Sequence, residues 1–306
     1  MNLILGSGVV GLVARHILGP EWVLVPFGRS RYYSHDIPFS DNYITIDSDV
    51  DDFIEEFNKD RPILFYKRPF SHTGQLMYQE VPLTVDSYLS KVYGDAIPSV
   101  ADKLLKTNLT VYSITCLELN RSLSRIYIDE INSRVASQGK VVSIRLSDKT
   151  VSCENQVLSF DNIVSTIPLN ALYDYCNLSC DLRSKDTCFY WIRSDKVDLE
   201  GAETSLVCDS NIAFYKVYKI SANDYIFCTF EPLDNPLSYF GQFIGYNFDL
   251  MEARRIKECF PLGDPPDSSL LDSYNIFCVG SNAEWDDFRN ISSCIKRLLG
   301  YSGRFK

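Results

Sequence analysis

The first eleven residues constrain the fold more strongly than any other stretch of this chain. Residues 2–5 are apolar and are typical of a short strand, which runs directly into three glycines at the spacing Gly6-x-Gly8-x-x-Gly11. A helical pattern follows at 12–18. In such a unit the first glycine permits the tight turn, the second lets a pyrophosphate approach the backbone, and the third lets the helix pack on the strand. The pattern therefore predicts a dinucleotide site at the start of the chain.

The helix after the glycines supplies the anion-binding part of this predicted site. Its first turn contains Val9 and Val10, whose backbone N–H groups have no partner within the helix. Free N–H groups and the partial positive charge of a helix N-terminus both favour a phosphate. An apolar strand at 21–25 would close a βαβ unit, so we expect a Rossmann-type parallel sheet.

Composition limits the classes of protein to which the chain can belong. Its 306 residues are 45% hydrophobic, which allows one or two domains with a large core. The formal net charge of −10 argues against a broad nucleic-acid surface, because phosphate contacts need clustered Lys and Arg. No apolar segment approaches the length of a membrane span and no targeting signal is evident, so we expect a cytoplasmic protein with no membrane association. The sequence gives no indication of oligomeric state.

The ten cysteines are irregularly spaced, and without a signal peptide they are expected to be reduced and in many cases buried. The closest pair is Cys176-x-x-x-Cys180, which has neither a second pair nor a nearby histidine. We therefore expect no metal site.

The rest of the chain is expected to combine a parallel sheet with antiparallel strands. From 125 to 164 the hydrophobic period is two, which predicts a small β-meander that ends in the apolar strand 161–168. Further strands are predicted at 62–66, 108–115, 188–192, 212–220, 225–231 and 276–280. Helices are predicted at 49–57, 85–92, 100–105, 251–259 and 291–299.

Three segments together resemble one large group of flavoproteins. They are the glycine motif 6–11, the segment Asp161-Asn-Ile-Val-Ser-Thr166-Ile-Pro168 after the meander, and the segment Ile276-Phe-Cys-Val-Gly280-Ser-Asn-Ala-Glu284, which continues to Asn290-Ile291. The group contains protoporphyrinogen oxidase, the monoamine oxidases and UDP-galactopyranose mutase, which bind FAD in a glutathione-reductase-like Rossmann domain. The third segment is most similar to the mutase branch.

The resemblance implies an α/β fold with a discontinuous FAD-binding domain, a β-meander, and a smaller mixed α+β substrate domain. The FAD-binding domain would comprise 1–48, 95–170 and 265–306, and the substrate domain 49–94 and 171–264. FAD is the implied cofactor, and a small molecule is the implied substrate. The implied cofactor-binding residues are Gly6, Gly8, Val9, Val10, Gly11, Thr166, Pro168, Gly280, Glu284, Asn290 and Ile291.

The last motif also has a physical rationale. If Asn290 caps a helix that begins at Ile291, the first N–H groups of this helix point outward. A reduced flavin carries negative charge, which a helix N-terminus stabilises. The alternative is an ordinary capped C-terminal helix.

One position departs from the pattern of the group. Its second strand usually ends in an acidic residue that binds the adenosine ribose, whereas this chain has Pro26-Phe27. Arg29 and Ser30 follow directly, and either could bind the cofactor instead, Arg29 through phosphate. A solvated basic turn is the alternative. Weak retention of FAD during purification is therefore expected.

The sequence offers few candidates for catalysis. His72 and Arg68 lie in a polar segment, 67–78, that is expected to form a loop of the substrate domain. An exposed histidine and a surface ion pair are the simpler interpretations of these two residues. Because flavin N5 usually carries the chemistry in such enzymes, the missing acid/base pair excludes nothing.

The leading functional hypothesis is an FAD-dependent oxidoreductase that transfers hydride between a small-molecule substrate and flavin N5. Three alternatives stay open at this point. The first is non-redox, mutase-like chemistry on a sugar nucleotide at reduced flavin. The second is a degenerate Rossmann protein that binds a nucleotide without turnover. The third is a dehydrogenase that uses NAD(P) alone, although NAD(P) could also serve as reductant of the flavin.

Overall fold

The structure is a computed structural model, and it describes residues 1–27, 43–45, 65–73, 84–98, 112–119, 133, 137–179, 181–199, 201–202, 204–284 and 291–302. All structural statements concern these residues. The segments predicted as helices at 49–57 and 100–105 and as a strand at 125–128 lie outside them.

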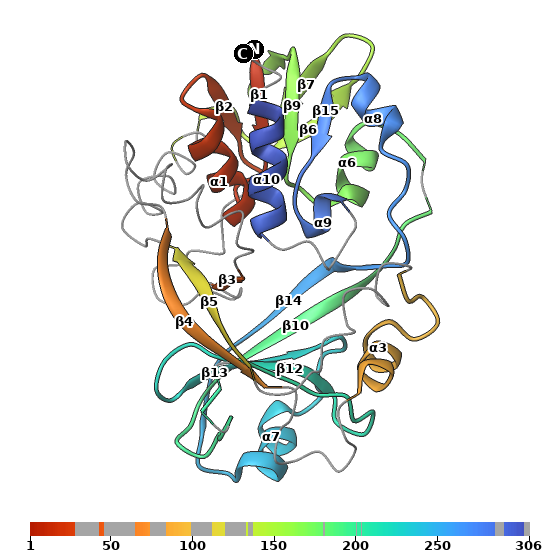
Figure 1. Cartoon of the computed structure of the whole chain (residues 1–306). Helices are drawn as coiled ribbons and strands as arrows, with labels where there is room; N and C mark the ends of the chain where they lie inside the picture. Colours follow the sequence, from red (N-terminus) through yellow and green to blue (C-terminus); the bar gives the residue numbers. More distant parts are fainter. Residues whose placement is uncertain are drawn as a thin grey trace.

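A parallel sheet of four strands contains the N-terminus of the chain (Figure 1). The order is β15-β9-β1-β2, and the strands are β1 (Asn2–Leu5), β2 (Trp22–Val25), β9 (Asn162–Ser165) and β15 (Ile276–Cys278). Two helices, α1 (Val9–Leu18) and α10 (Ile291–Ser302), contact each other on one face of the sheet. The predicted βαβ unit is confirmed, because β1 and β2 pair in parallel across α1.

The predicted meander is also confirmed and covers the other face of this sheet. It consists of β6 (Val141–Arg145), β7 (Thr150–Cys153) and β8 (Val157–Ser159), which pair antiparallel. Leu3 and Leu5 of β1 are fully buried in one cluster with Val151 and Leu158 of the meander. Because side chains alternate along a strand, Ile4 points to the helical face. Burial on both faces explains why β1 lacks polar residues after Asn2.

A mixed sheet of eight strands forms the second part of the fold, in the order β14-β10-β13-β12-β11-β4-β5-β3. Its strands are β3 (Tyr43–Thr45), β4 (Phe65–Thr73), β5 (Tyr112–Leu119), β10 (Arg183–Arg193), β11 (Thr204–Leu206), β12 (Phe214–Lys219), β13 (Asp224–Thr229) and β14 (Asp249–Leu262). Helix α7 (Pro236–Ile244) packs on one face through Phe240 and Ile244. Helix α3 (Val85–Tyr93), which the sequence predicts, packs on the other face through Leu89 and Val92. Three short helices complete the described part: α6 (Leu169–Tyr175), α8 (Ser269–Ser273) and α9 (Ser281–Glu284).

The helix predicted at 251–259 is wrong, because β14 runs through this segment. Met, Glu, Ala, Arg and Lys at 251–257 favour a helix when taken alone. The segment pairs instead with the long strand β10, from Asp249 beside Arg193 to Leu262 beside Arg183. Tertiary pairing therefore overrides local propensity at this edge of the sheet.

The loop predicted at 67–78 is also wrong in its first half, because 65–73 form β4, which pairs with β5. Strands β3 and β5 lie in ranges that the sequence groups with the cofactor-binding domain, yet they belong to the eight-stranded sheet. β3 and β5 pair with each other, and β5 also pairs with β4, although these strands are far apart in the chain. The sequence of a strand alone does not specify such a distant partner.

The two sheets have a defined orientation. The start of β1 and the last turn of α10 lie at the same end of the molecule, so the carboxyl ends of the parallel strands and the N-termini of α1 and α10 point toward the eight-stranded sheet (Figure 1). In open α/β sheets, ligands bind at this carboxyl edge. Among the described residues, no helix has both the length and the apolar character that crossing a membrane requires.

Candidate functional site

The glycine turn between β1 and α1 is the centre of the candidate site. Gly6 has φ +109°, a conformation that residues with a side chain rarely adopt. Its N–H donates to the carbonyl of Val25 at 3.0 Å, which joins the turn to β2. A Cβ at Gly6 would overlap with the Thr166 hydroxyl, and a Cβ at Gly11 would overlap with the Gly6 carbonyl oxygen. Two of the three glycines are therefore required by close packing of the turn itself.

Gly8 is different, because among the described residues, its two chain neighbours apart, no atom lies within 4 Å of the position that its Cβ would take. It is the N-cap of α1, with φ −74° and ψ −177°, and no side chain caps this helix. Its carbonyl accepts the first helical hydrogen bond, from Leu12, so the N–H groups before Leu12 have no partner within the helix. The start of α1 thus combines N–H groups that have no partner within the helix with space that the described residues leave open at Gly8, and both features suit an anion site.

Thr166 connects the second motif to the glycine turn. Its N–H and its hydroxyl both donate to the carbonyl of Leu5, at 2.8 and 3.0 Å. This hydroxyl also lies against Gly6, so Thr166 fixes the end of β1. Pro168 is the N-cap position of α6. The structure brings Thr166 next to the turn, as the motifs predict, but its hydroxyl already has an acceptor within the protein.

Gly280 brings the third motif to the same edge of the sheet. It follows β15 with φ +112°, and its Cβ position lies 3.4 Å from a methyl group of Val10 on α1. The carbonyl of Gly280 accepts from the N–H of Glu284 at 2.8 Å, which forms the turn of α9. Helix α10 begins at Ile291, as the sequence predicts, and it contacts α1. Gly8, Gly280 and the first turns of α1 and α10 therefore surround one region of the carboxyl edge.

Several predicted site residues lie outside the part that the structure describes. They are Arg29, Ser30 and Asn290. His72 and Arg68 are placed only as positions on β4, where His72 is in register with Thr204 and Arg68 with Cys116. Phe27, at the position of the missing acidic residue, contacts Tyr175 edge-on, with ring centroids 5.7 Å apart.

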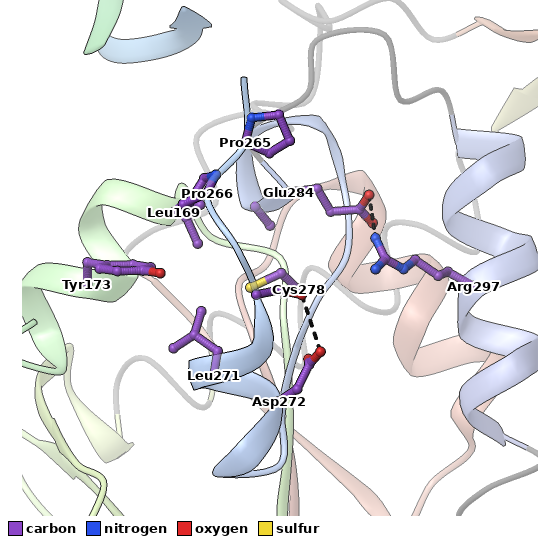
Figure 2. A pocket seen from close by; sticks show the side chains of 11 residues that line it. Leu169, Tyr173, Pro265, Pro266, Leu271, Asp272, Cys278, Glu284 and Arg297 are labelled. Carbon is purple, nitrogen blue, oxygen red and sulfur yellow. Dashed lines mark hydrogen bonds and ion pairs between the residues drawn. The ribbon is translucent and has the colours of Figure 1, made fainter. Parts of the chain in front are cut away.

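Glu284 lines a cavity of about 150 Å³ beside β15 (Figure 2). Its carboxylate is 6% exposed and lies 2.7 Å from Nη1 of Arg297 on α10. Figure 2 shows this pair on one side of the cavity, with Tyr173 and Leu271 on the other. The ion pair thus joins the turn after Gly280 to the helix whose N-terminus faces the carboxyl edge.

The interior of this cavity is not suited to nucleophilic chemistry. Burial, with the negative charges of Glu284 and Asp272 nearby, raises the pKa of the Cys278 thiol to about 12. Asp272 accepts a hydrogen bond from the Ser268 hydroxyl at 3.2 Å. A thiol in such surroundings stays protonated and unreactive. Cys278 is therefore a packing residue.

The sequence predicts Glu284 as a cofactor-binding residue, but it gives no indication that Arg297 is the partner of Glu284. Arg297 lies two turns into α10, where a charged residue is usually solvent-exposed. Glu284 and Arg297 are thirteen positions apart and belong to different helices, so no helical periodicity in the sequence predicts their contact. The cavity therefore becomes visible only in the structure.

The remaining cysteines give no metal site among the described residues. Seven of the described cysteines are buried: Cys153, Cys176, Cys188, Cys208, Cys228, Cys278 and Cys294. In the same part of the chain, no group of three or more His, Cys, Asp or Glu side chains is arranged to hold a metal ion. Cys180 lies outside the described residues.

Solved structures with the same architecture are numerous, although no protein-family model and no curated protein matches the sequence. A crystal structure of reduced UDP-galactopyranose mutase is similar with TM-score 0.65 and 12% identity, over 99% of this chain and 93% of that chain. An oxidoreductase from Methanosarcina mazei gives TM-score 0.62 and 10% identity, over 99% of both chains. An Exiguobacterium protein to which a protoporphyrinogen oxidase function has been ascribed gives 0.56 and 11%, over 99% of this chain and 98% of that one. The chain therefore has the Rossmann-type fold of UDP-galactopyranose mutase and its structural relatives, and the resemblance carried by its three motifs is confirmed at the level of the fold.

Proposed function

We propose that this protein is an FAD-dependent enzyme that binds the pyrophosphate of the dinucleotide at the Gly8 turn. The observation that carries the proposal is the space that the described residues leave open at Gly8, directly before the N-terminus of α1, which none of their side chains caps. Gly6 and Gly11 are explained by packing within the turn, whereas no contact with another described residue explains Gly8. A glycine at this position is explained if an anion must come close to the backbone, because a side chain would block its approach.

The residues at the carboxyl edge of the parallel sheet also suit the ribityl and flavin parts of FAD. In the proposed mode the N–H groups of Val9 and Val10 face the pyrophosphate, and Gly280 lets the chain pass close to the ribityl part. The N-terminus of α10 points to the same region and would stabilise negative charge on a reduced flavin ring. Glu284 holds this arrangement through Arg297 and is a positioning residue for α10.

When bound, FAD supplies a hydride acceptor or donor at N5, and we propose hydride transfer with a small-molecule substrate as the reaction. The eight-stranded sheet lies opposite the carboxyl edge, so its residues are suited to orient the substrate and exclude water from it (Figure 1). Non-redox chemistry on a sugar nucleotide is the second candidate. It is supported by the structural similarity to UDP-galactopyranose mutase, for which the TM-score is 0.65.

The test is reconstitution of purified protein with FAD, followed by desalting and a visible spectrum. Flavin absorbance at about 450 nm that remains with the protein supports the proposal. Gly8→Val should abolish this absorbance, because a side chain would fill the open space, while thermal unfolding stays near that of the wild type. Gly300→Val is the matched control. Among the described residues, Gly300 likewise has no atom within 4 Å of its Cβ position beyond its own helix backbone and chain neighbours, but it lies at the far end of α10.

The outcomes separate the alternatives. Stabilisation by NADPH without any effect of FAD would indicate a dehydrogenase. The absence of binding by both cofactors would indicate an accessory protein without turnover. With flavin bound, bleaching by a substrate supports redox chemistry, whereas turnover of UDP-galactopyranose only after reduction by dithionite supports the mutase-like reaction.

A further inference from the structure

A polar groove with one exposed aromatic ring lies at the distal end of the eight-stranded sheet. We call it the Tyr246 groove; it is formed around Tyr246, Phe248, Asn223, Asn247, Asp249 and Arg193, and its volume is about 530 Å³. Arg193 and Asp249 pair at one end of β10 and β14, ten residues along β10 from Arg183. At about 3.3 Å per residue, the groove lies about 30 Å along the strand from the end that leads back to the parallel sheet.

The ring of Tyr246 is held in place although it is 76% exposed. A Cβ at Gly241 of α7 would overlap with three carbons of this ring, so the ring rests directly on the helix backbone. Helix α7 is itself fixed, because Phe240 beside Gly241 is completely buried. Ordering an exposed side chain costs conformational entropy, which contact with a rigid helix reduces. Tyr246 therefore forms a preorganised aromatic platform.

The polar groups around this platform are available for a ligand. Within the described part of the chain, the side chains of Asn223, Asn247 and Asp249 have no hydrogen-bond partner. Arg193 is already oriented, since its Nε donates to Asp224 at 2.9 Å. Amide groups donate and accept, and a carboxylate accepts, so the groove can bind hydroxyl groups in both roles.

The same residues exclude other ligand classes. A drug-like apolar ligand needs a mainly apolar pocket, whereas here Phe248 is the only other aromatic ring among the described lining residues. An anionic ligand would meet Asp249 and Asp195, and the guanidinium of Arg193 is neutralised by Asp224. A neutral ligand that has an apolar face and a rim of hydroxyl groups matches all of these features.

We propose that the Tyr246 groove is a binding site for a neutral saccharide, whose C–H face stacks on Tyr246 while its hydroxyl groups bind Asn223, Asn247 and Asp249. The site is separate from the carboxyl edge of the parallel sheet and does not depend on the proposed cofactor. It would hold a sugar chain or glycan at the end of the eight-stranded sheet that lies away from the parallel sheet.

Saturation-transfer NMR with galactose, N-acetylglucosamine, maltotriose and cellotriose tests the site in the full-length protein. At least one of these saccharides should receive saturation at its ring C–H protons. Tyr246→Ala should weaken that binding about fivefold or more, because an aromatic contact of this kind contributes about 1 kcal/mol. Tyr246→Phe should retain it, and Gly241→Ala should weaken it by displacing the ring.

Leu237→Ala is the matched control, because Leu237 lies on the same helix, is 53% exposed and is not part of the groove. Thermal unfolding of each variant checks that the fold is retained. Binding of none of the four saccharides would overturn the proposal. So would binding that survives Tyr246→Ala, since the saccharide would then occupy another site, or binding lost equally in Tyr246→Phe.

Discussion

The carbonyl oxygen of Gly6 occupies the space that a side chain at Gly11 would need. The two residues are five positions apart, on opposite sides of a strand-to-helix turn. This contact separates the structural glycines of the motif from Gly8, whose Cβ position is left open by the described residues. The motif thus serves folding and binding through different residues.

Gly11→Ala should therefore destabilise the protein, although alanine is the better helix former. The gain in helix propensity is about 1 kcal/mol. Overlap with a backbone oxygen that cannot move without displacing β1 costs about 1–3 kcal/mol or more. We expect a net loss in the free energy of unfolding, measured by urea denaturation. Gly8→Ala is the control and should stay within about 1 kcal/mol of the wild type, since only the capping preference changes. Equal losses in both variants would contradict this assignment.

The Glu284–Arg297 ion pair should respond asymmetrically to mutation. Glu284 is 6% exposed and Arg297 is 40% exposed. Removing Arg297 leaves a buried carboxylate without its counter-charge, which costs about 3 kcal/mol. Removing Glu284 leaves a guanidinium that can reach water, which costs about 1 kcal/mol.

Arg297→Met, Glu284→Gln and the double variant, compared by urea denaturation, measure this difference. The double variant should be more stable than Arg297→Met alone. If Glu284→Gln proves the more damaging single change, the buried carboxylate is not the critical charge of the pair.

Sequence reasoning succeeds where the determinants are local. The unit from β1 through Gly6 and Gly11 to the end of α1 is encoded in seventeen consecutive residues, and the meander is encoded by its period of two. It fails at β14, where Met251–Lys257 favour a helix but pair with β10 from a distant part of the chain. The Tyr246 groove has no sequence signal, because Arg193, Asn223 and Tyr246 come together only through the ends of three elements.

Lys91 attaches α3 to the loop between β11 and β12, and its removal should destabilise the protein. Its ammonium group donates to the carbonyl oxygens of Asp209, Ile212 and Phe214 at 2.6, 2.7 and 2.9 Å. Lys91→Met keeps the length of the side chain but leaves three partly buried acceptors without this donor. The expected loss is about 3 kcal/mol by urea denaturation. Lys219→Met, at a half-buried position at the end of β12 in the same sheet, should have little effect. Similar losses in both variants would show that α3 does not depend on this attachment.

Lys91 should also make stability depend on pH. Burial lowers the pKa of its ammonium group from 10.5 to about 8. The folded protein then binds this proton more weakly than the unfolded chain, so the contribution of Lys91 to stability rises between about pH 8 and pH 10.5. The difference in unfolding free energy between the wild type and Lys91→Met should increase over this range. A difference that is constant or falls with pH would contradict the lowered pKa.

Cys278 should contribute the opposite pH dependence. Burial beside Glu284 raises the pKa of its thiol from 9.0 to about 12, so the folded state keeps a proton that the unfolded chain loses. The stability that this group contributes is fully present below pH 9 and is lost as the pH rises toward 12. Relative to Cys278→Ala, the wild type should therefore lose unfolding free energy between pH 9 and the alkaline limit of the measurement. Peptide mapping after treatment with a maleimide at pH 8 provides a second check. Cys278 should be labelled only after denaturation, whereas rapid labelling of the native protein would show that the thiol is accessible and ionised, and that the cavity beside β15 is open to a reagent of that size.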